Sequence, residues 1–452
     1  MSLSRIPAPR SLSSAIKAVL SVVALLALAS VSAIAGPCTG PGAPTTTETK
    51  CLTAIAIPGN PLRSFDISWV DAERGLYFLG DRSNAGVDII STNTNTFLGR
   101  AGGFVGILPA TALSDPQHVG ANNNISGPDG VVSRGKCLYA GDGNSTLRVY
   151  DISDPTKPTL VGSPISTGGT TRLDEVALTS DGKTLIAANN AEDPPFATVF
   201  STDPGDCDST IFVAKVEADA ATIPAGAGLS IEQPTWVESI HRFIVSVPTI
   251  ANNSFDPTNC NYGSVIRSAT APPCSGAVLV VDPTNVLTPI ESVVSLNHCG
   301  PNGATPGPNG NVMVGCTPNN QAGDTETTVI NVNGFHYVDV GNLSGSDEVW
   351  FNEGSNRYYT ASSAMRTGGL PNPVLGVVNG TTNFLVEAIP QSTASHSVAA
   401  DSRRNRIYVP EVAPKTVVGL GGDVTAAGVG AGICGSMNGC IAVYSAPRVD
   451  EE

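Results

Sequence analysis

One short unit recurs along the chain, and it constrains the fold more than any other feature. Residues 395–410 read SHSVAADSRRNRIYVP, in which two apolar segments flank a polar turn, as in a β-hairpin. Similar hairpins begin near residues 66, 174, 233 and 347. The chain has three tryptophans, Trp69, Trp236 and Trp350, and each lies three residues after the start of a unit. This common spacing aligns the units and predicts a repeated strand pair.

Each hairpin is followed by further strand-like segments, which together make the four-stranded unit typical of a β-propeller blade. Seven such units fit the chain, although six or eight remain alternatives because the second and fifth match less well. The last unit lacks a fourth strand, and residues 52–57 (LTAIAI) can supply it by pairing with residues 441–444. The sequence therefore predicts an all-β, seven-bladed β-propeller closed by an N-terminal strand, which removes two open sheet edges.

The first 35 residues have the features of a cleaved secretory signal. Arg5, Arg10 and Lys17 precede an apolar run at residues 18–31, and an Ala-Ile-Ala sequence ends at Ala35. The apolar run is short for a membrane span, and no later stretch is long and apolar enough to be one. We therefore expect a signal peptide at residues 1–35, a single propeller domain at residues 36–452, and a secreted or periplasmic protein.

The charge of the chain restricts the kinds of molecule that it can bind. Without the predicted leader it has 21 basic and 39 acidic residues, a net charge of −18. Such a surface repels nucleic acid and anionic membranes. The alternative is that the charge only maintains solubility. If the charge does select ligands, it favours cationic or neutral ones.

Ten cysteines in an exported chain indicate disulfide bonds. Their positions on the repeat place them in pairs within one loop, on one blade or on adjacent blades. The predicted pairs are Cys38–Cys51, Cys137–Cys207, Cys260–Cys274, Cys299–Cys316 and Cys434–Cys440. No C-x-x-C motif occurs, so a zinc ribbon or a thioredoxin-like motif is not indicated.

The hairpins also resemble a known class of propeller. DSRRNRIYVP and SDGKTLIAAN are similar to the repeats of bacterial YVTN-type and lactonase-like seven-bladed propellers, and DEVALTSDGKTLIAAN is similar to a strand pair of gluconolactonase- and regucalcin-type enzymes. The resemblance implies the propeller fold over most of residues 52–446. For function it implies only candidates, because propellers host many activities.

Insertions fall on one face of the predicted ring, here called the top. On this face lie the loops that join each blade to the next and the loops between the second and third strand of each blade. The long top loops are residues 101–128, 248–276, 317–327, 362–373 and 411–439. Long loops on a rigid scaffold are common binding elements, although tolerated insertions are an alternative.

The first residue of each unit should lie at the top of the central channel. Around the ring these residues are Asp66, Asp129, Asp174, Gln233, Asn302, Asp347 and His396. Every one can bind a ligand through hydrogen bonds, and we predict that they form the ligand-binding mouth. Converging carboxylates repel each other unless a cation or protons compensate them. The carboxylates that could bind Ca, Mg, Mn or Zn are Asp66, Asp129, Asp174 and Asp347. The alternative is that all of these groups cap strand ends and bind water.

Histidines and tryptophans add weaker signals. His118 and His298 fall in predicted top loops, where they could act as bases or ligands. His241 and His336 fall in bottom turns, where we expect structural or solvated side chains. We expect the three tryptophans to pack between blades. No G-x-S-x-G or H-E-x-x-H motif occurs, so neither a serine hydrolase of that type nor a zincin is indicated.

Two classes of function follow from these observations. The first is an exported binding or scaffold protein whose top face captures a small ligand or a partner. The second is a lactonase-like hydrolase in which a divalent cation sits at the top of the channel and a carboxylate or His396 moves protons, as the family resemblance implies. No complete catalytic set is visible, so the sequence favours the first and does not identify a catalytic residue.

Overall fold

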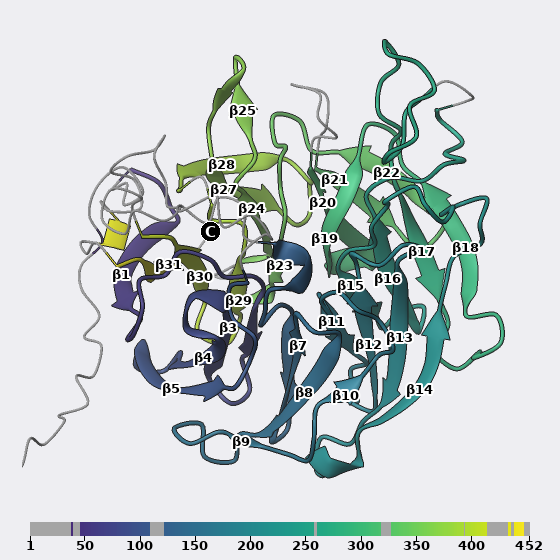
Figure 1. Cartoon of the computed structure of the whole chain (residues 1–452). Helices are drawn as coiled ribbons and strands as arrows, with labels where there is room; N and C mark the ends of the chain where they lie inside the picture. The colour runs from purple at the N-terminus through teal and green to yellow at the C-terminus, as the bar shows by residue number, and fades with distance from the viewer. Residues whose placement is uncertain are drawn as a thin grey trace, which may run out of the picture. The chain divides into compact units, whose positions relative to one another are not determined.

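The chain winds seven antiparallel sheets around a central channel in the computed structural model (Figure 1). The structure describes residues 38, 46–108, 122–256, 260–317, 327–392, 394–413, 433–434 and 438–446, all in one unit, Ala33–Glu452. The innermost strand of each blade comes first in the chain and the outermost comes last, except in the seventh blade. The prediction of an all-β, seven-bladed propeller is confirmed.

Blades 1 to 4 follow the chain from residue 68 to residue 295. Blade 1 contains β2 (Ser68–Asp71), β3 (Leu76–Asp81), β4 (Gly86–Ser91) and β5 (Thr96–Gly102). Blade 2 contains β6 (Val131–Arg134), β7 (Cys137–Asp142), β8 (Thr146–Asp151), β9 (Thr159–Leu160) and β10 (Ile165–Ser166). Blade 3 contains β11 (Val176–Leu178), β12 (Thr184–Asn189), β13 (Phe196–Ser201) and β14 (Ile211–Val216). Blade 4 contains β15 (Pro234–Val237), β16 (Arg242–Val247), β17 (Ala277–Val281) and β18 (Ile290–Ser295).

Blades 5 to 7 complete the ring. Blade 5 contains β19 (Gly300–Pro306), β20 (Asn311–Thr317), β21 (Thr328–Asn331) and β22 (His336–Asp339). Blade 6 contains β23 (Val349–Asn352), β24 (Arg357–Ser362), β27 (Val374–Asn379) and β28 (Leu385–Pro390), with a small hairpin of β25 (Arg366–Thr367) and β26 (Leu370–Pro371) between its second and third strands. Blade 7 contains β29 (Ala399–Asp401), β30 (Arg406–Glu411), β31 (Cys440–Ser445) and β1 (Lys50–Ala56). Short 3-10 helices lie in loops: η1 (Arg82–Asn84), η2 (Asn123–Ile125), η3 (Cys207–Ser209), η4 (Pro308–Gly310) and η5 (Glu353–Ser355).

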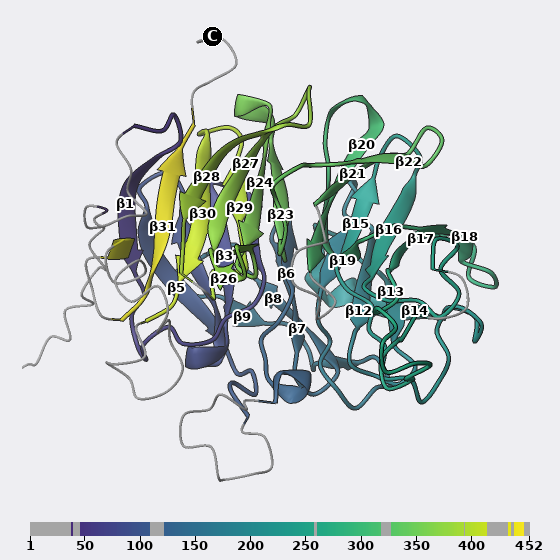
Figure 2. The same ribbon diagram turned by 90° about the horizontal axis from the view of Figure 1, so that it is seen from above.

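The N-terminal strand closes the ring as predicted. β1 is the outermost strand of blade 7 and pairs antiparallel with β31, with Ile55 opposite Ile441 and Cys51 opposite Tyr444. In the view turned by 90°, the two strands, coloured purple and yellow, lie next to each other (Figure 2). The hydrogen bonds between them satisfy the outer edge of β31, which would otherwise be exposed.

A polar residue at the end of the inner strand stabilises the hairpin turn in blades 1 and 7. The Asp71 carboxylate accepts a hydrogen bond from the backbone N–H of Arg74 at 2.9 Å, and the Asp401 carboxylate accepts one from that of Arg404 at 3.1 Å. Aspartate favours this position because its side chain bonds to the backbone two or three residues later. These two aligned units therefore share this contact in their turns.

The apolar core consists of seven clusters, each lying between two neighbouring blades. Between blades 7 and 1, for example, Ile55, Tyr77 and Tyr408 are all fully buried, and the two tyrosine rings stack at 5.0 Å. Side chains on both faces of each sheet are therefore buried against the next blade. This arrangement fixes the inner strands around the channel, where the candidate site lies.

All five predicted disulfides are present. Cys137 in blade 2 bonds to Cys207 in blade 3, so this bridge joins two blades, whereas Cys260–Cys274 closes a loop within blade 4. No helix in the described part of the chain is long and apolar enough to cross a membrane. The predicted signal peptide, His118 and most of the loop at residues 411–439 lie outside the described residues.

Candidate functional site

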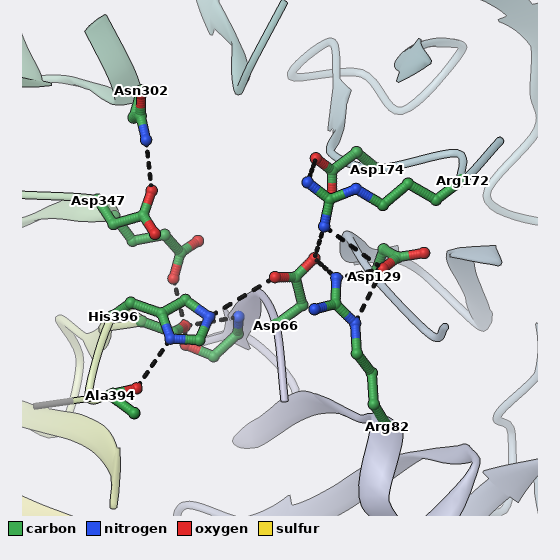
Figure 3. A network of polar contacts seen from close by, with 12 residues as sticks. Asp66, Arg82, Asp129, Arg172, Asp174, Asn302, Asp347, Ala394 and His396 are labelled. Atoms are coloured by element: carbon green, nitrogen blue, oxygen red, sulfur yellow. Dashed lines mark hydrogen bonds and ion pairs between the residues drawn. The ribbon is translucent and has the colours of Figure 1, made fainter. Parts of the chain in front are cut away.

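Three of the four predicted carboxylates converge at the top of the channel. Asp66, Asp129 and Asp174 directly precede the inner strands of blades 1, 2 and 3, and one oxygen from each lies within 4.8 Å of the others. All three side chains are buried. Asp347 does not join them within the described residues; it lies across the mouth, where the Asn302 amide donates a hydrogen bond to its carboxylate at 2.8 Å (Figure 3).

Two arginines lie among these carboxylates, and the sequence analysis did not predict them. Arg82, from the short η1 helix of blade 1, donates to Asp129 and lies 2.6 Å from Asp66. Arg172, from the loop between blades 2 and 3, lies 2.8 Å from Asp174 and 3.8 Å from Asp66 (Figure 3). The guanidinium groups therefore supply positive charge at the point where the carboxylates meet.

Burial and ion pairing act in opposite directions on these acids. Burial opposes ionisation of Asp66, but the charges of Arg82 and Arg172 and the contact with His396 hold the pKa of its carboxyl below the usual range. Burial raises the pKa of Asp129 and of Asp174 well above their ordinary value, despite the nearby arginines. The cluster is thus a buried ion-pair network with an excess of acidic groups.

This arrangement bears directly on the predicted metal site. A divalent cation between the three aspartates would have to displace Arg82 and Arg172, which lie against the same oxygens. Two guanidinium groups beside a dication would also be repelled. The residues present therefore do not fit a metal ion in this arrangement, and metal binding stays a prediction that the experiments below test.

His396 also lines the mouth, on the side of Asp66 that faces away from Arg82 and Arg172 (Figure 3). Its Nδ1 contacts the Ala394 carbonyl at 2.8 Å, its Nε2 lies 3.6 Å from Asp66, and its ring stacks on Phe65 with centroids 4.6 Å apart. Burial disfavours the imidazolium, but the contacts with Asp66 and Asp347 raise the pKa of His396 above its ordinary value. The ring is held in one orientation and favours the protonated form more than a free histidine does.

A second polar layer lies below the mouth. Gln233 donates to the Glu348 carboxylate at 3.2 Å and accepts from the backbone of Ala304 at 2.8 Å. Glu348 also accepts hydrogen bonds from the Ser397 hydroxyl and, at 3.1 Å, from the Val398 N–H. Complete burial raises the pKa of Glu348 to about 8. This layer separates the mouth from the lower channel.

The mouth is a hollow of about 380 Å³. It is lined by Arg63, Ser64, Phe65, Asp66, Arg82, Asn123, Arg172, Asp347, Ser363, Ala394, His396 and Val412. Most of these residues come from the two kinds of top loop, as the sequence analysis predicted. Arg63 differs from the other two arginines because its buried Nε and Nη1 have no hydrogen-bond partner among the described residues, and burial lowers the pKa of its guanidinium. A ligand with an acidic group would supply the missing charge.

The remaining predicted residues lie elsewhere. His298 is exposed in the connection before β19 and does not line the mouth. His241 and His336 are exposed, the former in the hairpin turn of blade 4, as predicted for solvated residues. The tryptophans do pack against the cores between blades, but all three also line the lower channel, which the sequence analysis did not anticipate.

The sequence held only weak signals for the site residues that were not predicted, Arg82, Arg172 and Glu348. Arg172 lies two residues before Asp174, and Arg82 follows β3 directly, but neither position is basic in the other aligned units. Glu348 follows Asp347 just as Glu175 follows Asp174, so the repeated Asp-Glu pair could have identified the second acidic layer. Both glutamates are buried.

Comparison with known proteins supports the repeat architecture. Residues 129–164 match the LVIVD repeat. This segment begins at Asp129 and spans the strands of blade 2 up to β9. No curated protein matches the sequence.

Solved propellers share the fold at low sequence identity. A chain of Kuenenia stuttgartiensis hydrazine synthase superposes with a TM-score of 0.52 and 11% identity, covering 78% of this chain and 94% of that one. A chain from the mitotic checkpoint complex gives a TM-score of 0.54 and 10% identity, covering 90% and 96% respectively. At this level of identity the likeness concerns the fold alone.

Proposed function

We propose that this protein is an exported binding protein whose top mouth captures a small polar ligand carrying a carboxylate. The observation that carries the proposal is Arg63, whose buried Nε and Nη1 have no acceptor in the described part of the chain, while the other arginines of the mouth are paired. A ligand carboxylate in the mouth would lie beside this guanidinium and compensate its buried charge. Three arginines and two aspartates line the mouth, whereas acidic residues predominate in the chain as a whole and had favoured cationic or neutral ligands.

The other walls of the mouth suit a ligand of this kind. The stacked pair of Phe65 and His396 offers a rigid flat surface, and His396 can donate a hydrogen bond from Nε2. Asp347, across the mouth, can accept one. Fixed polar groups of this kind orient a small ligand.

Export is part of the same proposal. Five disulfides suit an oxidising compartment, and the first 35 residues have the composition of a secretory signal. Detection of the chain outside the cytoplasm, with its N-terminus at Gly36, would support both statements. Retention of the uncleaved chain in the cytoplasm would contradict them.

Thermal melts test the binding proposal. Residues 36–452 would be melted with millimolar acetate, succinate or citrate at constant ionic strength, with sorbitol as the uncharged control. We expect a saturable rise in Tm with at least one carboxylate, because a ligand that binds only the folded state stabilises it. Arg63→Gln should abolish the rise, whereas Arg366→Gln, an exposed arginine in β25, should keep it. Carboxylates that leave Tm unchanged, or that act equally on Arg63→Gln, would refute the proposal.

The lactonase-like hydrolase is the second candidate: Asp66, Asp129 and Asp174 converge as its cation site requires, but a cation could bind there only if Arg82 and Arg172 moved away. Melts with Ca, Mg, Mn or Zn, with and without chelator, test this alternative together with assays of lactone hydrolysis. A metal-dependent rise in Tm that Asp174→Asn removes and Asp347→Asn retains would support a site at the three aspartates. Identical melts in every condition would leave the binding protein as the only candidate.

A further inference from the structure

The lower half of the central channel contains a second hollow. It has a volume of about 480 Å³, within the range of small-molecule sites. No described residue lines both this hollow and the mouth, and the layer of Gln233, Glu348 and Ser397 lies between them. A ligand of the lower hollow would therefore enter from the bottom face.

The walls of this lower hollow are mostly apolar and aromatic, and its charged lining residues are Arg134 and Glu353. All three tryptophans of the chain line it, and the rings of Trp69 and Trp350 meet edge to face with centroids 5.0 Å apart. Trp236 lines it from blade 4, held by a hydrogen bond from its indole N–H to Glu238 at 2.6 Å. Further contacts come from inner-strand valines, alanines and hydroxyl side chains. Such walls suit a ligand with an aromatic or aliphatic body.

The bottom opening carries positive charge. An adjoining hollow of about 740 Å³ shares five lining residues with the lower hollow, among them Trp69 and Arg134. Its basic lining residues are Arg74, Arg134, Lys136 and Arg403, and its acidic ones are Asp71 and Glu73. Basic residues thus outnumber acidic ones here, although acidic residues predominate in the chain as a whole.

Two of these arginines are positioned by neighbouring backbone. Arg74 donates to the carbonyls of Gly135 at 3.0 Å and Ile152 at 2.6 Å, which fixes its charge beside blade 2. The stem of Arg134 packs against Gly182. A side chain at position 182 would place its Cβ only 2.5 Å from the Cγ of Arg134. Arg134 lines both hollows and its side chain is exposed, so its guanidinium is available to a ligand.

We propose that the lower channel binds an organic anion, whose apolar body lies between the tryptophans and whose acidic group contacts Arg134 and Arg403 at the bottom opening. Apolar burial would supply most of the binding free energy, and the arginines would orient the acid. The site is separate from the top mouth and does not depend on the function proposed for it.

Two fluorescent probes test the proposal with the intact mature chain. 1-Anilinonaphthalene-8-sulfonate has an apolar body and an acid, whereas N-phenyl-1-naphthylamine has a similar body and no charge. Because all the tryptophans line the lower hollow, energy transfer from tryptophan to the naphthalene ring reports binding near them. We expect saturable binding of the sulfonate at one site per chain, and weaker binding of the neutral probe.

Variants separate the two parts of the proposed site. Arg134→Gln combined with Arg403→Gln should weaken sulfonate binding about tenfold and change binding of the neutral probe less than twofold, while Arg134→Lys should keep most of the affinity. Ala72→Trp, where the two hollows join, should block both probes. Lys157→Gln, an exposed base elsewhere, and Arg63→Gln, at the top mouth, should change neither.

Circular dichroism and Tm would establish that each variant is folded. The proposal would be overturned if the sulfonate showed no saturable binding, if Ala72→Trp bound it normally, or if the arginine variants lost both probes equally. Loss of sulfonate binding in Arg63→Gln alone would place that ligand at the top mouth and would also overturn the proposal for the lower channel.

Discussion

The guanidinium group of Arg82 lies 2.6 Å from the Asp66 carboxylate and also donates to Asp129, so that one side chain joins the starts of two blades. All three residues are buried. Charges removed from water in this way are stable only while they remain paired. The network therefore compensates the acidic ring of the channel from within the protein.

Removing this cation should strongly destabilise the fold. We expect Arg82→Met to lower the free energy of unfolding by about 3–5 kcal/mol, because buried carboxylates would lose their partner. Urea denaturation measures the effect. The double variant Arg82→Met/Asp129→Asn should recover part of the loss, and Arg366→Met, on an exposed hairpin, should change stability by less than about 0.5 kcal/mol. A loss below about 1 kcal/mol would show that the ion pairs are not essential.

Stability should decline as pH rises through neutrality. Burial raises the pKa of Glu348 to about 8 from 4.5, so the folded protein binds more protons than the unfolded chain between these pH values. The free energy of unfolding then falls with increasing pH over this range, by up to about 1.4 kcal/mol per unit from this group. Glu232, whose pKa burial raises to about 7, acts in the same direction.

Glu348→Gln isolates that contribution. Urea denaturation between pH 5 and pH 8 should show a flatter dependence than the unchanged protein, whereas Glu73→Gln, an exposed acid, should keep the original slope. The slope that remains should reflect Glu232, the raised carboxyl pKa values of Asp129 and Asp174, and also His396, since a raised histidine pKa likewise gives stability that is lost as pH rises. Equal slopes for both variants would contradict the assignment to Glu348.

Ring closure should contribute to the stability of the whole domain. Ile55 in β1 is fully buried opposite Ile441, whereas Leu52 in the same strand is 43% exposed. Ile55→Ala should lower the free energy of unfolding by about 2–5 kcal/mol through the cavity it leaves, and Leu52→Ala should have a much smaller effect. Deletion of residues 36–60 should lower the Tm of the entire domain. An unchanged melt after that deletion would contradict closure.

The bridge between blades should stabilise more than the bridge within one loop. Cys137 and Cys207 are 70 residues apart in sequence, and Cys260 and Cys274 are 14 apart. Loop-closure entropy then gives contributions of about 4 and about 3 kcal/mol. Paired Cys→Ala variants and urea denaturation measure both. A larger loss from Cys260→Ala/Cys274→Ala would mean that contacts in the folded state, and not loop length, determine the difference.

The sequence contained enough information for the blades because their features are local. Alternating apolar residues, the polar residue of the hairpin turns and the shared tryptophan position all act within about 15 residues. Ring closure could be predicted because the last unit lacked a strand and residues 52–57 had no other partner strand. The disulfide pairs could be predicted once each cysteine had been assigned to a strand or loop of the repeat.

The chemistry of the channel was only partly predictable. The register placed Asp66, Asp129 and Asp174 at the top correctly, but it also placed Asp347 with them, although this residue lies across the mouth with Asn302. Equivalent positions on different blades are equidistant from the channel axis only in an ideal ring. Which carboxylates touch depends on the actual tilt and spacing of the blades.

The sequence by itself thus determined the repeated sheet, because hydrogen bonding and side-chain alternation along a strand are short-range. Its closure and its disulfides followed from the repeat, through the missing strand of the last unit and the place of each cysteine. Only the tertiary structure decided how the buried charges are compensated and where the channel is open. Arg82 and Arg172 reach the aspartates from loops outside the repeat pattern. Coulomb energy depends on distances through space, and in a ring of blades residues far apart in sequence come within a few ångströms of each other.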